Sequence, residues 1–424
     1  MKITNLLKLG GMCMKTIKLG IFGLGRGGGF MKDVLANNGE VVALCDRDVS
    51  KMEAAASNLP EKPAFYTDFE EFIKHDMDAV FLANCFHEHA PFAIRCLEAG
   101  FHVLSECTSN ATMAEGVALV RAAEKSKGFY MLAENYPFMR FNQEMRRVYR
   151  GGSLGKAVYA EGEYNHPFNM DDTEGHKALR PYPDHWRNYL PRTYYITHSL
   201  APLMYITGAI PKRVSALACY APFKEFNHIG SAVGDRAAII TTLNHDDSVY
   251  KVTGCAAYGA HNNSYRVCGT LGQIENLRGI PEKVMLRYND WNIPEGMEEI
   301  NHYLPEWPAE LKELIEKAGH GGGDFFVIKE FFDCIRENRQ PEFDVHFATT
   351  CASVGILGHR SLMEQGVPYD IPDFHKEEDR KKYENDTLTP FLNGDKSSNI
   401  PVCSHPDYRP TPEQYANYVK IVSE

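Results

Sequence analysis

The stretch IKLGIFGLGRGG, residues 17–28, decides the fold of the first part of the chain. A short, apolar, β-branched run leads directly into a glycine-rich turn, and the residues after the turn have a helical pattern. In this context Gly23, Gly25 and Gly28 are placed where a turn must be tight, where a backbone must approach a pyrophosphate, and where a helix meets a strand. The stretch therefore predicts a dinucleotide site, with the pyrophosphate on the amides of a helix that begins near Gly27.

A carboxylate at the end of the next predicted strand strengthens this interpretation. Asp46 lies eighteen residues past Gly28, where it can accept hydrogen bonds from an adenosine ribose. Its charge repels a 2′-phosphate, which favours NAD, although the adjacent Arg47 could reach such a phosphate and bind NADP. The structural alternative is a glycine-rich turn that binds no dinucleotide.

The surrounding pattern predicts an α/β chain of two domains. Short apolar runs alternate with helical stretches up to about residue 135, which indicates βαβ units and a Rossmann-type, doubly wound parallel sheet. After Pro137, runs of alternating strands indicate a second, α+β domain with a largely antiparallel open sheet. We expect an N-terminal extension over 1–13, an NAD-binding domain over 14–137, a substrate and oligomerisation domain over 138–372, and a C-terminal tail over 373–424. The polar tail is either solvated or packed on a neighbouring subunit.

Composition limits the function classes. The 424 residues are 44% apolar and 24% charged, as in ordinary globular proteins, and the net charge of −11 argues against nucleic acid or an anionic membrane as a partner. Eleven cysteines without CxxC spacing indicate reduced thiols in a cytoplasmic protein. The first thirteen residues are too short for a signal peptide, and no later window is apolar enough to span a membrane. We expect a cytoplasmic enzyme with a small-molecule substrate.

Four motifs resemble the Gfo/Idh/MocA family of sugar-handling oxidoreductases over most of residues 15–372. They are GIFGLGRGG (20–28), LANCFHEHAPFAIRCLEAGFHVLSE (82–106), AENYPFMR (133–140) and GHGGGDFFVIKEFFDCIRENRQPEFDV (319–345). The resemblance implies a nicotinamide-binding domain joined to an open-sheet domain, a carbohydrate substrate in the cleft over the nicotinamide, and a homo-oligomer, dimer or tetramer, associating through the sheet.

One departure from that family directs the functional prediction. Many of its dehydrogenases carry a catalytic lysine in a Glu-Lys-Pro motif where this chain has Ser105-Glu106-Cys107-Thr108, so another group must move the proton. The chain is similar in this respect to glycoside hydrolase family 109, which its AEGEYNH (160–166), YITH (195–198) and HGGGD (320–324) segments also resemble. That branch implies redox-neutral glycoside cleavage: hydride leaves C3 for NAD+, the C2 proton is removed, the C1 group is eliminated, water adds, and hydride returns.

Two other functions stay open. One is a sugar or polyol dehydrogenase, inositol-like in its substrate, that releases NADH at each turnover. The other is a catalytically silent NAD-binding sensor, against which the polar site residues argue.

Histidine and tyrosine supply the candidate catalytic groups, because both accept or donate protons near neutral pH. His198 is the candidate base, and Tyr195 shares its face if residues 193–206 are helical. Tyr164 and His166, two residues apart on a predicted strand, point the same way. The alternative for each ring is an interfacial side chain with a satisfied polar tip, and the motif match favours catalysis for His198 and Tyr195. No cluster has metal spacing, although a metal could bind through His166 and His198.

The remaining candidates contact substrate or cofactor. Trp186 and Arg187 lie in a segment rich in His, Pro and aromatics that suits sugar binding, and the resemblance places His320 and Asp324 at the cleft. The alternative for this last pair is a flexible turn whose Asp324 caps the following helix. His87 and His89 follow the fourth strand and are expected to shape the cofactor pocket. The predicted cofactor-binding residues are Gly23, Gly25, Arg26, Gly28, Asp46, Arg47, Asn84, His87, His89, Glu106 and Asn135.

Overall fold

The computed structural model describes residues 15–392 and 396–424, so the predicted extension over 1–13 lies outside the described residues. The chain divides into two compact units. Unit 1 comprises residues up to Ser109, Ala118–Arg140 and Glu306–Ala348, and unit 2 comprises Asn110–Val117, Phe141–Pro305 and Thr349–Glu424. We describe each unit by itself.

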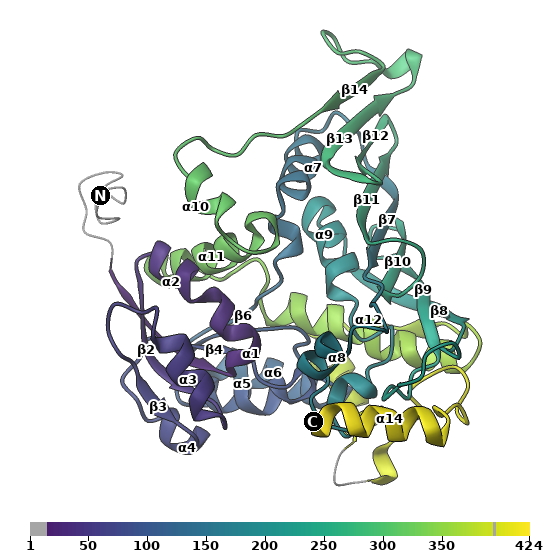
Figure 1. Cartoon of the computed structure of the whole chain (residues 1–424). Coiled ribbons are helices and arrows are strands. Elements are labelled where there is room, and N and C mark those ends of the chain that lie inside the picture. Colours follow the sequence, from purple (N-terminus) through teal and green to yellow (C-terminus); the bar gives the residue numbers. More distant parts are fainter. Residues whose placement is uncertain (1–14, 393–395) are drawn as a thin grey trace. The chain divides into compact units, whose positions relative to one another are not determined.

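Unit 1 contains a six-stranded parallel sheet in the order β3-β2-β1-β4-β5-β6. Figure 1 labels β2, β3, β4 and β6 of this sheet. The order reverses beside β1, which is the arrangement of a dinucleotide-binding Rossmann sheet. Strands β4 and β6 are apolar and buried at every residue, as expected when helices cover both faces of a parallel sheet. The strands are β1 (Ile17–Phe22), β2 (Gly39–Cys45), β3 (Ala64–Tyr66), β4 (Ala79–Leu82), β5 (His102–Ser105) and β6 (Tyr130–Leu132). The helices are α1 (Leu24–Gly27), α2 (Met31–Ala36), α3 (Val49–Ala56), α4 (Phe69–Phe72), α5 (His89–Glu98), α6 (Met113–Lys125, shared with unit 2), α10 (Lys312–Glu316) and α11 (Gly323–Glu337).

Unit 2 contains a nine-stranded sheet in the order β14-β13-β12-β11-β7-β10-β9-β8-β15. Every pairing is antiparallel except β7 with β10, so the predicted, largely antiparallel sheet is confirmed. The strands are β7 (Ala157–Asn165), β8 (Pro211–Tyr220), β9 (Asp235–Asn244), β10 (Val249–Ala256), β11 (Asn262–Gly269), β12 (Gly272–Leu277), β13 (Ile280–Tyr288), β14 (Ile300–Tyr303) and β15 (Tyr369–Asp370). The helices are α7 (Arg140–Arg150), α8 (Thr173–Leu179), α9 (Thr197–Thr207), α12 (Val345–Met363), α13 (Glu377–Tyr383) and α14 (Pro412–Ser423).

One segment belongs to a different unit from the one that the sequence predicts. Residues 306–348 are expected in the second domain but group with unit 1, because α11 packs on α2. The α11 ring of Phe332 lies where a side chain at Gly39 would stand, since a Cβ there would be 2.4 Å from Phe332 Cε2. Arg336 of the same helix donates from Nη2 to the carbonyl oxygen of Asn37 at 2.8 Å. These contacts attach α11 to the start of β2 and to the turn that precedes it.

Part of the C-terminal tail packs on its own chain, through one buried side chain of α14. Helix α14 begins with a capping box between Thr411 and Gln414 and buries Tyr418 completely. The Tyr418 hydroxyl lies 2.9 Å from the carbonyl oxygen of Arg180 and accepts from Nδ2 of Asn188 at 3.0 Å. The tail therefore packs on unit 2 of its own chain and supports the segment around residues 180–188.

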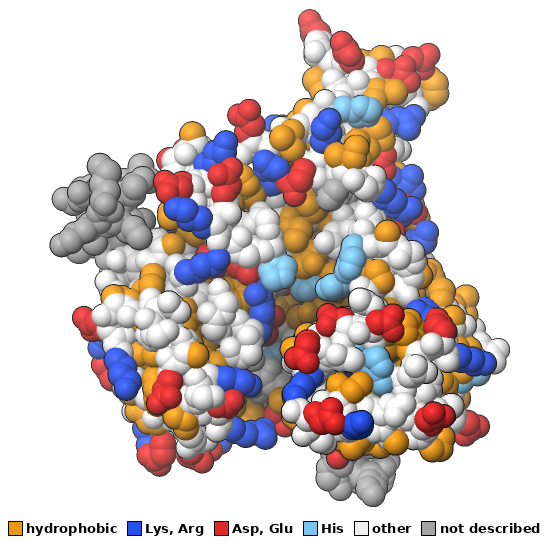
Figure 2. Space-filling model, in the orientation of Figure 1, with side chains coloured by type: hydrophobic (Ala, Val, Ile, Leu, Met, Phe, Trp, Pro, Cys, Tyr) orange, Lys and Arg blue, Asp and Glu red, His pale blue; other side chains and the backbone are white. Residues whose placement is uncertain are grey.

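The surface carries no simple single-sign field on the face seen in Figure 2, where acidic and basic side chains are interspersed. Among the described residues, none of the helices combines the length and apolar content that a membrane crossing requires.

Candidate functional site

The glycine-rich turn of unit 1 has the shape that a dinucleotide needs. Gly23 has a φ of +90°, and a Cβ on it would lie 2.4 Å from the carbonyl oxygen of Ala83, so only glycine fits. A Cβ on Gly25 or Gly28 would meet open space, which leaves these backbones accessible to a diphosphate. Two details differ from the prediction. The helix begins at Leu24, and Gly27 provides the close helix–strand contact expected of Gly28, because a Cβ on Gly27 would lie 2.7 Å from Ile21 Cγ2.

Asp46 stands at the end of β2, as predicted for a ribose ligand. Its Oδ2 accepts a hydrogen bond from the amide of Leu24 at 2.8 Å, and Oδ1 accepts from the amide of Asp48 at 3.0 Å. These bonds fix the carboxylate beside the turn, and each oxygen keeps a second lone pair for a ribose hydroxyl. Arg47 is exposed next to it.

The residues after β4 divide into one open polar group and one anchor. Both side-chain polar atoms of Asn84 are buried without a hydrogen-bond partner among the described residues, which is the state expected of a group that binds a ligand. His89 instead hydrogen-bonds through Nδ1 to the carbonyl oxygen of Thr108 at 2.9 Å, and burial lowers its pKa to about 4. Burial likewise lowers the pKa of His87. The turn, Asp46 and Asn84 together fit a bound NAD.

Arg26 is the centre of an ionic network within unit 1. Its Nε donates to Oε1 of Glu106 at 3.0 Å, and its Nη2 donates to Oδ1 of Asp324 at 2.7 Å. The same Asp324 oxygen accepts from Nδ2 of Asn135 at 2.7 Å, while Oδ2 lies 3.0 Å from Nδ1 of His320. Five predicted cofactor or substrate residues therefore form one network, in which Arg26, Asn135 and His320 contact the buried carboxylate of Asp324. They come from distant parts of the sequence.

The carboxylate of Asp324 holds this network together rather than capping a helix. The N-cap of α11 is Gly322, and no side chain caps it, so the alternative interpretation, in which Asp324 caps this helix, is wrong. Burial alone would raise the pKa of Asp324, but hydrogen bonds from His320 and Arg26 outweigh it and hold the pKa below its usual range. Contact of His320 and Asp324 with substrate stays a prediction.

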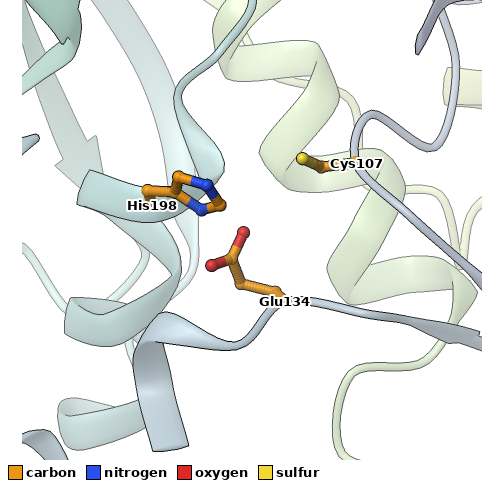
Figure 3. Close-up of side chains that lie close together, drawn as sticks. All are labelled: Cys107, Glu134 and His198. Atoms are coloured by element: carbon orange, nitrogen blue, oxygen red, sulfur yellow. The ribbon is translucent and has the colours of Figure 1, made fainter. Parts of the chain in front are cut away.

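Two buried groups that the sequence analysis did not place in the site lie at neighbouring strand ends of unit 1. Cys107 follows β5 at the position of the missing lysine, and Glu134 follows β6 (Figure 3). The Cys107 sulfur and a Glu134 oxygen lie within 4.8 Å of each other. Departure from the Glu-Lys-Pro motif is the sequence signal that points to Cys107. Glu134 has no comparable signal.

The four predicted catalytic rings cluster in unit 2. His198 stands in the first turn of α9 (Figure 3), and its ring centroid lies 4.8 Å from that of Tyr164 and 4.9 Å from that of Tyr195. The His166 ring lies 5.8 Å from Tyr164 and 4.7 Å from His261. Partial burial, together with the charges of His261, His198 and Arg187, lowers the pKa of His166. His166 is therefore neutral, and able to accept a proton, at neutral pH.

A close approach of backbones brings these rings together. A Cβ on Gly162 of β7 would lie 2.0 Å from the carbonyl oxygen of Ser199, so α9 lies directly on the strand that ends beside Tyr164 (Figure 1). The hydroxyl of Tyr265 donates to the His198 carbonyl and fixes this turn. Tyr195 precedes α9 instead of sharing a helical face with His198, because the chain turns after Pro191 and the helix begins at Thr197.

A cavity of about 300 Å³ opens beside these rings, entirely within unit 2. This volume is at the lower end of the range for small-molecule sites. Arg187 lines it, with its guanidinium 4.3 Å from the Trp186 ring centroid, whereas Trp186 itself does not. The lining consists of Tyr164, His166, Phe168, His176, Leu179, Arg180, Arg187, Leu190, Arg192, Tyr195, Ser231, Val233 and Cys255. Of these residues, the sequence motifs predicted only Tyr164, His166, Tyr195 and Arg187, because the others lie in no motif.

Comparison with known proteins agrees with this geometry in both halves of the chain. Residues 17–134 match the family model described as oxidoreductase family, NAD-binding Rossmann fold, and residues 229–381 match the model of the glycosyl hydrolase 109 C-terminal domain. A glycosyl hydrolase family 109 protein of Shewanella pealeana is 25% identical over 392 residues, covering 85% of this chain and 86% of its own. One from Streptomyces filamentosus is 28% identical over 407 residues, covering 86% and 79%.

Solved structures share the fold at low sequence identity. A levoglucosan dehydrogenase in complex with NADH and L-sorbose aligns with a TM-score of 0.68 at 16% identity, covering 85% of this chain and 100% of that one. An oxidoreductase from Agrobacterium radiobacter in complex with NAD+, L-tartaric acid and magnesium aligns with a TM-score of 0.67 at 14% identity, covering 84% and 98%. Both family models match in their expected order, and together with the relatives they support the Gfo/Idh/MocA family of NAD-binding oxidoreductases, in its glycosyl hydrolase 109-like branch, as the family of this chain.

Proposed function

We propose that this enzyme cleaves a glycoside without net oxidation, by oxidising a ring carbon, C3, eliminating the group on C1, adding water and reducing C3 again. The observation that carries the proposal is the cluster of Tyr164, Tyr195 and His198, with ring centroids within 5.9 Å of one another, beside a sugar-sized cavity. The similarity of the chain to glycosyl hydrolase family 109 proteins supports the same reaction.

The cofactor contributes one chemical capability: bound NAD accepts a hydride and later returns it. Unit 1 binds it through the open backbones of Gly25 and Gly28, through Asp46 at the ribose, and through the unpartnered amide of Asn84. Asp46 disfavours a 2′-phosphate, so NAD is preferred over NADP.

The proton transfers are assigned to the side chains of unit 2. His198 takes the proton of the C3 hydroxyl, because a neutral imidazole is an effective base near pH 7. Once C3 is a ketone, the C2 hydrogen becomes acidic and His166, whose pKa is lowered, removes it. A phenol from Tyr164 or Tyr195 protonates the departing glycosidic oxygen, after which water adds to C1 and C2 regains a proton. No pair of carboxylates is required, unlike in the common glycosidases.

The test is to follow two products in one reaction. The purified enzyme is incubated with 4-nitrophenyl glycosides of both anomeric configurations and a catalytic amount of NAD. Release of 4-nitrophenol over many turnovers, with no accumulation of NADH, is the expected result. One NADH for each sugar consumed would identify a dehydrogenase, and firm NAD binding without turnover of any sugar would identify a sensor.

A further inference from the structure

Three arginines converge on the cavity of unit 2. Arg180 follows α8, Arg187 lies in the short 3-10 turn Trp186–Asn188, and Arg192 precedes α9, and all three line the cavity together with Tyr164 and Tyr195. We refer to Arg180, Arg187 and Arg192 as the arginine cluster.

No carboxylate balances the arginine cluster inside the cavity. None of the described residues that line it is Asp or Glu, and none of the three guanidinium groups forms an ion pair within the described part of the chain. Arg192 donates from Nε to the carbonyl oxygen of Asp235 at 2.8 Å and from Nη1 to that of Cys255 at 3.3 Å, which are neutral acceptors. The Asp235 carboxylate is nearby but accepts from the amide and hydroxyl of Ser404.

Arg180 is the most exceptional member of the cluster. Its Nη1 is buried and has no hydrogen-bond partner among the described residues. Burial, followed by repulsion from Arg192 and Arg187, lowers its pKa to about 10, so it is still charged at neutral pH. A buried cation without a counter-charge is costly, and a guanidinium is suited to bind a carboxylate or sulfate through paired hydrogen bonds.

The same unit contains an arginine whose role is structural, and its surroundings are different. Arg360 of α12 donates from Nη1 and Nη2 to the two oxygens of Asp386 at 2.6 and 2.7 Å. There the protein supplies the anion itself. In the cavity, by contrast, the three guanidinium groups have no carboxylate partner among the described residues.

We propose that the arginine cluster binds an anionic group on the sugar, so that the substrate class is a uronic acid glycoside or a sulfated glycoside. That this ligand is the substrate rests on the proposed function. Its binding to the arginine cluster does not. The tyrosines contact the ring, and the arginines contact its carboxylate or sulfate.

The experiment measures binding apart from turnover. Isothermal titration calorimetry of the enzyme loaded with NADH, which cannot accept a hydride and so prevents turnover, compares 4-nitrophenyl glucosides and galactosides, in both anomeric forms, with the matching glucuronides, galacturonides and 6-sulfates. We expect at least one anionic glycoside to bind tenfold or more tighter than its neutral counterpart, with the difference shrinking as salt increases. The uronides and the 6-sulfates separate the two anion chemistries.

Substitutions locate the effect. Arg180→Gln should reduce the ratio of anionic to neutral affinity towards one, and Arg180→Lys, which keeps the charge, should retain part of it. Arg213→Gln is the matched control, because Arg213 is an exposed arginine of the same unit whose partner is Asp370. If Arg180→Gln does not fold, the comparison of anionic and neutral glycosides in the unsubstituted enzyme still decides.

The outcomes distinguish this inference from the proposed function. Arginine-dependent binding of an anionic glycoside without release of 4-nitrophenol would support the inference and refute the glycosidase function. Cleavage of neutral glycosides with no preference for anionic ones would support the glycosidase function and refute the inference. Failure of every anionic glycoside to bind, or an unchanged preference in Arg180→Gln, overturns the inference.

Discussion

Arg26 of unit 1 and the arginine cluster of unit 2 are both partly buried cations, but their surroundings are opposite. Arg26 forms ion pairs with Glu106 and Asp324 at 3.0 and 2.7 Å. The arginine cluster instead faces a cavity that is lined by no Asp or Glu among the described residues. The difference indicates what each region is built for. The paired charges around Arg26 fix the loops beside the nucleotide turn. The unpaired charges of the arginine cluster are available to bind an anionic ligand. Four substitutions test that division, in order of expected size.

The largest effect is expected from removing the candidate base of unit 2. His198→Asn should lower kcat by about 100-fold or more, because general base catalysis contributes on that order. NAD affinity, a property of unit 1, should be unchanged in calorimetry. A loss of less than about threefold on the true substrate would reassign the base, and a parallel loss of NAD binding would break the division between the units.

Opening the closed network of unit 1 should cost stability. Asp324→Asn removes the carboxylate that accepts from Arg26, His320 and Asn135, and the expected loss is about 2 kcal/mol, or about 5 °C in Tm. The folded-state pKa of Asp324 is lowered, so its contribution is complete above the unfolded pKa and is lost as the pH falls below about 4. Thermal melts of both proteins should therefore converge in acid.

A surface carboxylate provides the control for this variant. Glu337 lies at the exposed end of the same α11 and pairs with Arg339. Glu337→Gln should shift Tm by less than about 1 °C, since exposed pairs contribute little. An equal shift in the two variants would mean that the buried network has no special role.

Removing the carboxylate that binds the ribose should weaken NAD binding by an intermediate amount. Asp46→Ala removes the carboxylate at the end of β2, and NAD should bind about tenfold more weakly, or about 1.4 kcal/mol. NADP should lose less, because the repulsion of its 2′-phosphate disappears. Glu53→Gln on the exposed face of α3 is the control, and fluorescence titration with both cofactors gives the measurement. Unaltered NAD affinity in Asp46→Ala would contradict the assigned ribose contact.

The smallest effect concerns the support of the arginine cluster. Tyr418→Phe removes the hydroxyl that contacts the Arg180 carbonyl and Asn188, at a cost of about 1 kcal/mol. Tyr415→Phe, on the exposed side of α14, should cost almost nothing. A Tm shift in the first variant alone would show that the C-terminal helix stabilises the cavity wall, and equal behaviour would contradict it.

Local patterns predicted unit 1 well, because its nucleotide turn is built from neighbouring residues. The strand Ile17–Phe22, the turn at Gly23 and the carboxylate at Asp46 are all within thirty residues of one another, and each is found where the pattern indicates. The sequence did not predict that Gly27, and not Gly28, makes the close helix–strand contact. Both residues are glycines, and only the packing on Ile21 distinguishes them.

Unit 2 was predicted less completely, because its cavity is assembled from distant segments. Sequence motifs identified His198 and Tyr164 through their resemblance to a family, but the Gly162–Ser199 approach that joins them has no sequence signature. Arg180 and Arg192 lie in irregular chain without periodicity, so nothing indicated that both face one cavity. The same reason explains why the pairing of Arg26 with Asp324, nearly three hundred residues later, was not foreseen.

Deuterium incorporation tests the central claim most directly. The enzyme is allowed to cleave a 4-nitrophenyl glycoside in D2O with catalytic NAD, and the released sugar is examined by proton NMR. Oxidation, elimination and return of the same hydride predict a product with deuterium at C2 and the original hydrogen at C3. A product that keeps its hydrogen at C2, as direct displacement at C1 would give, would contradict the account.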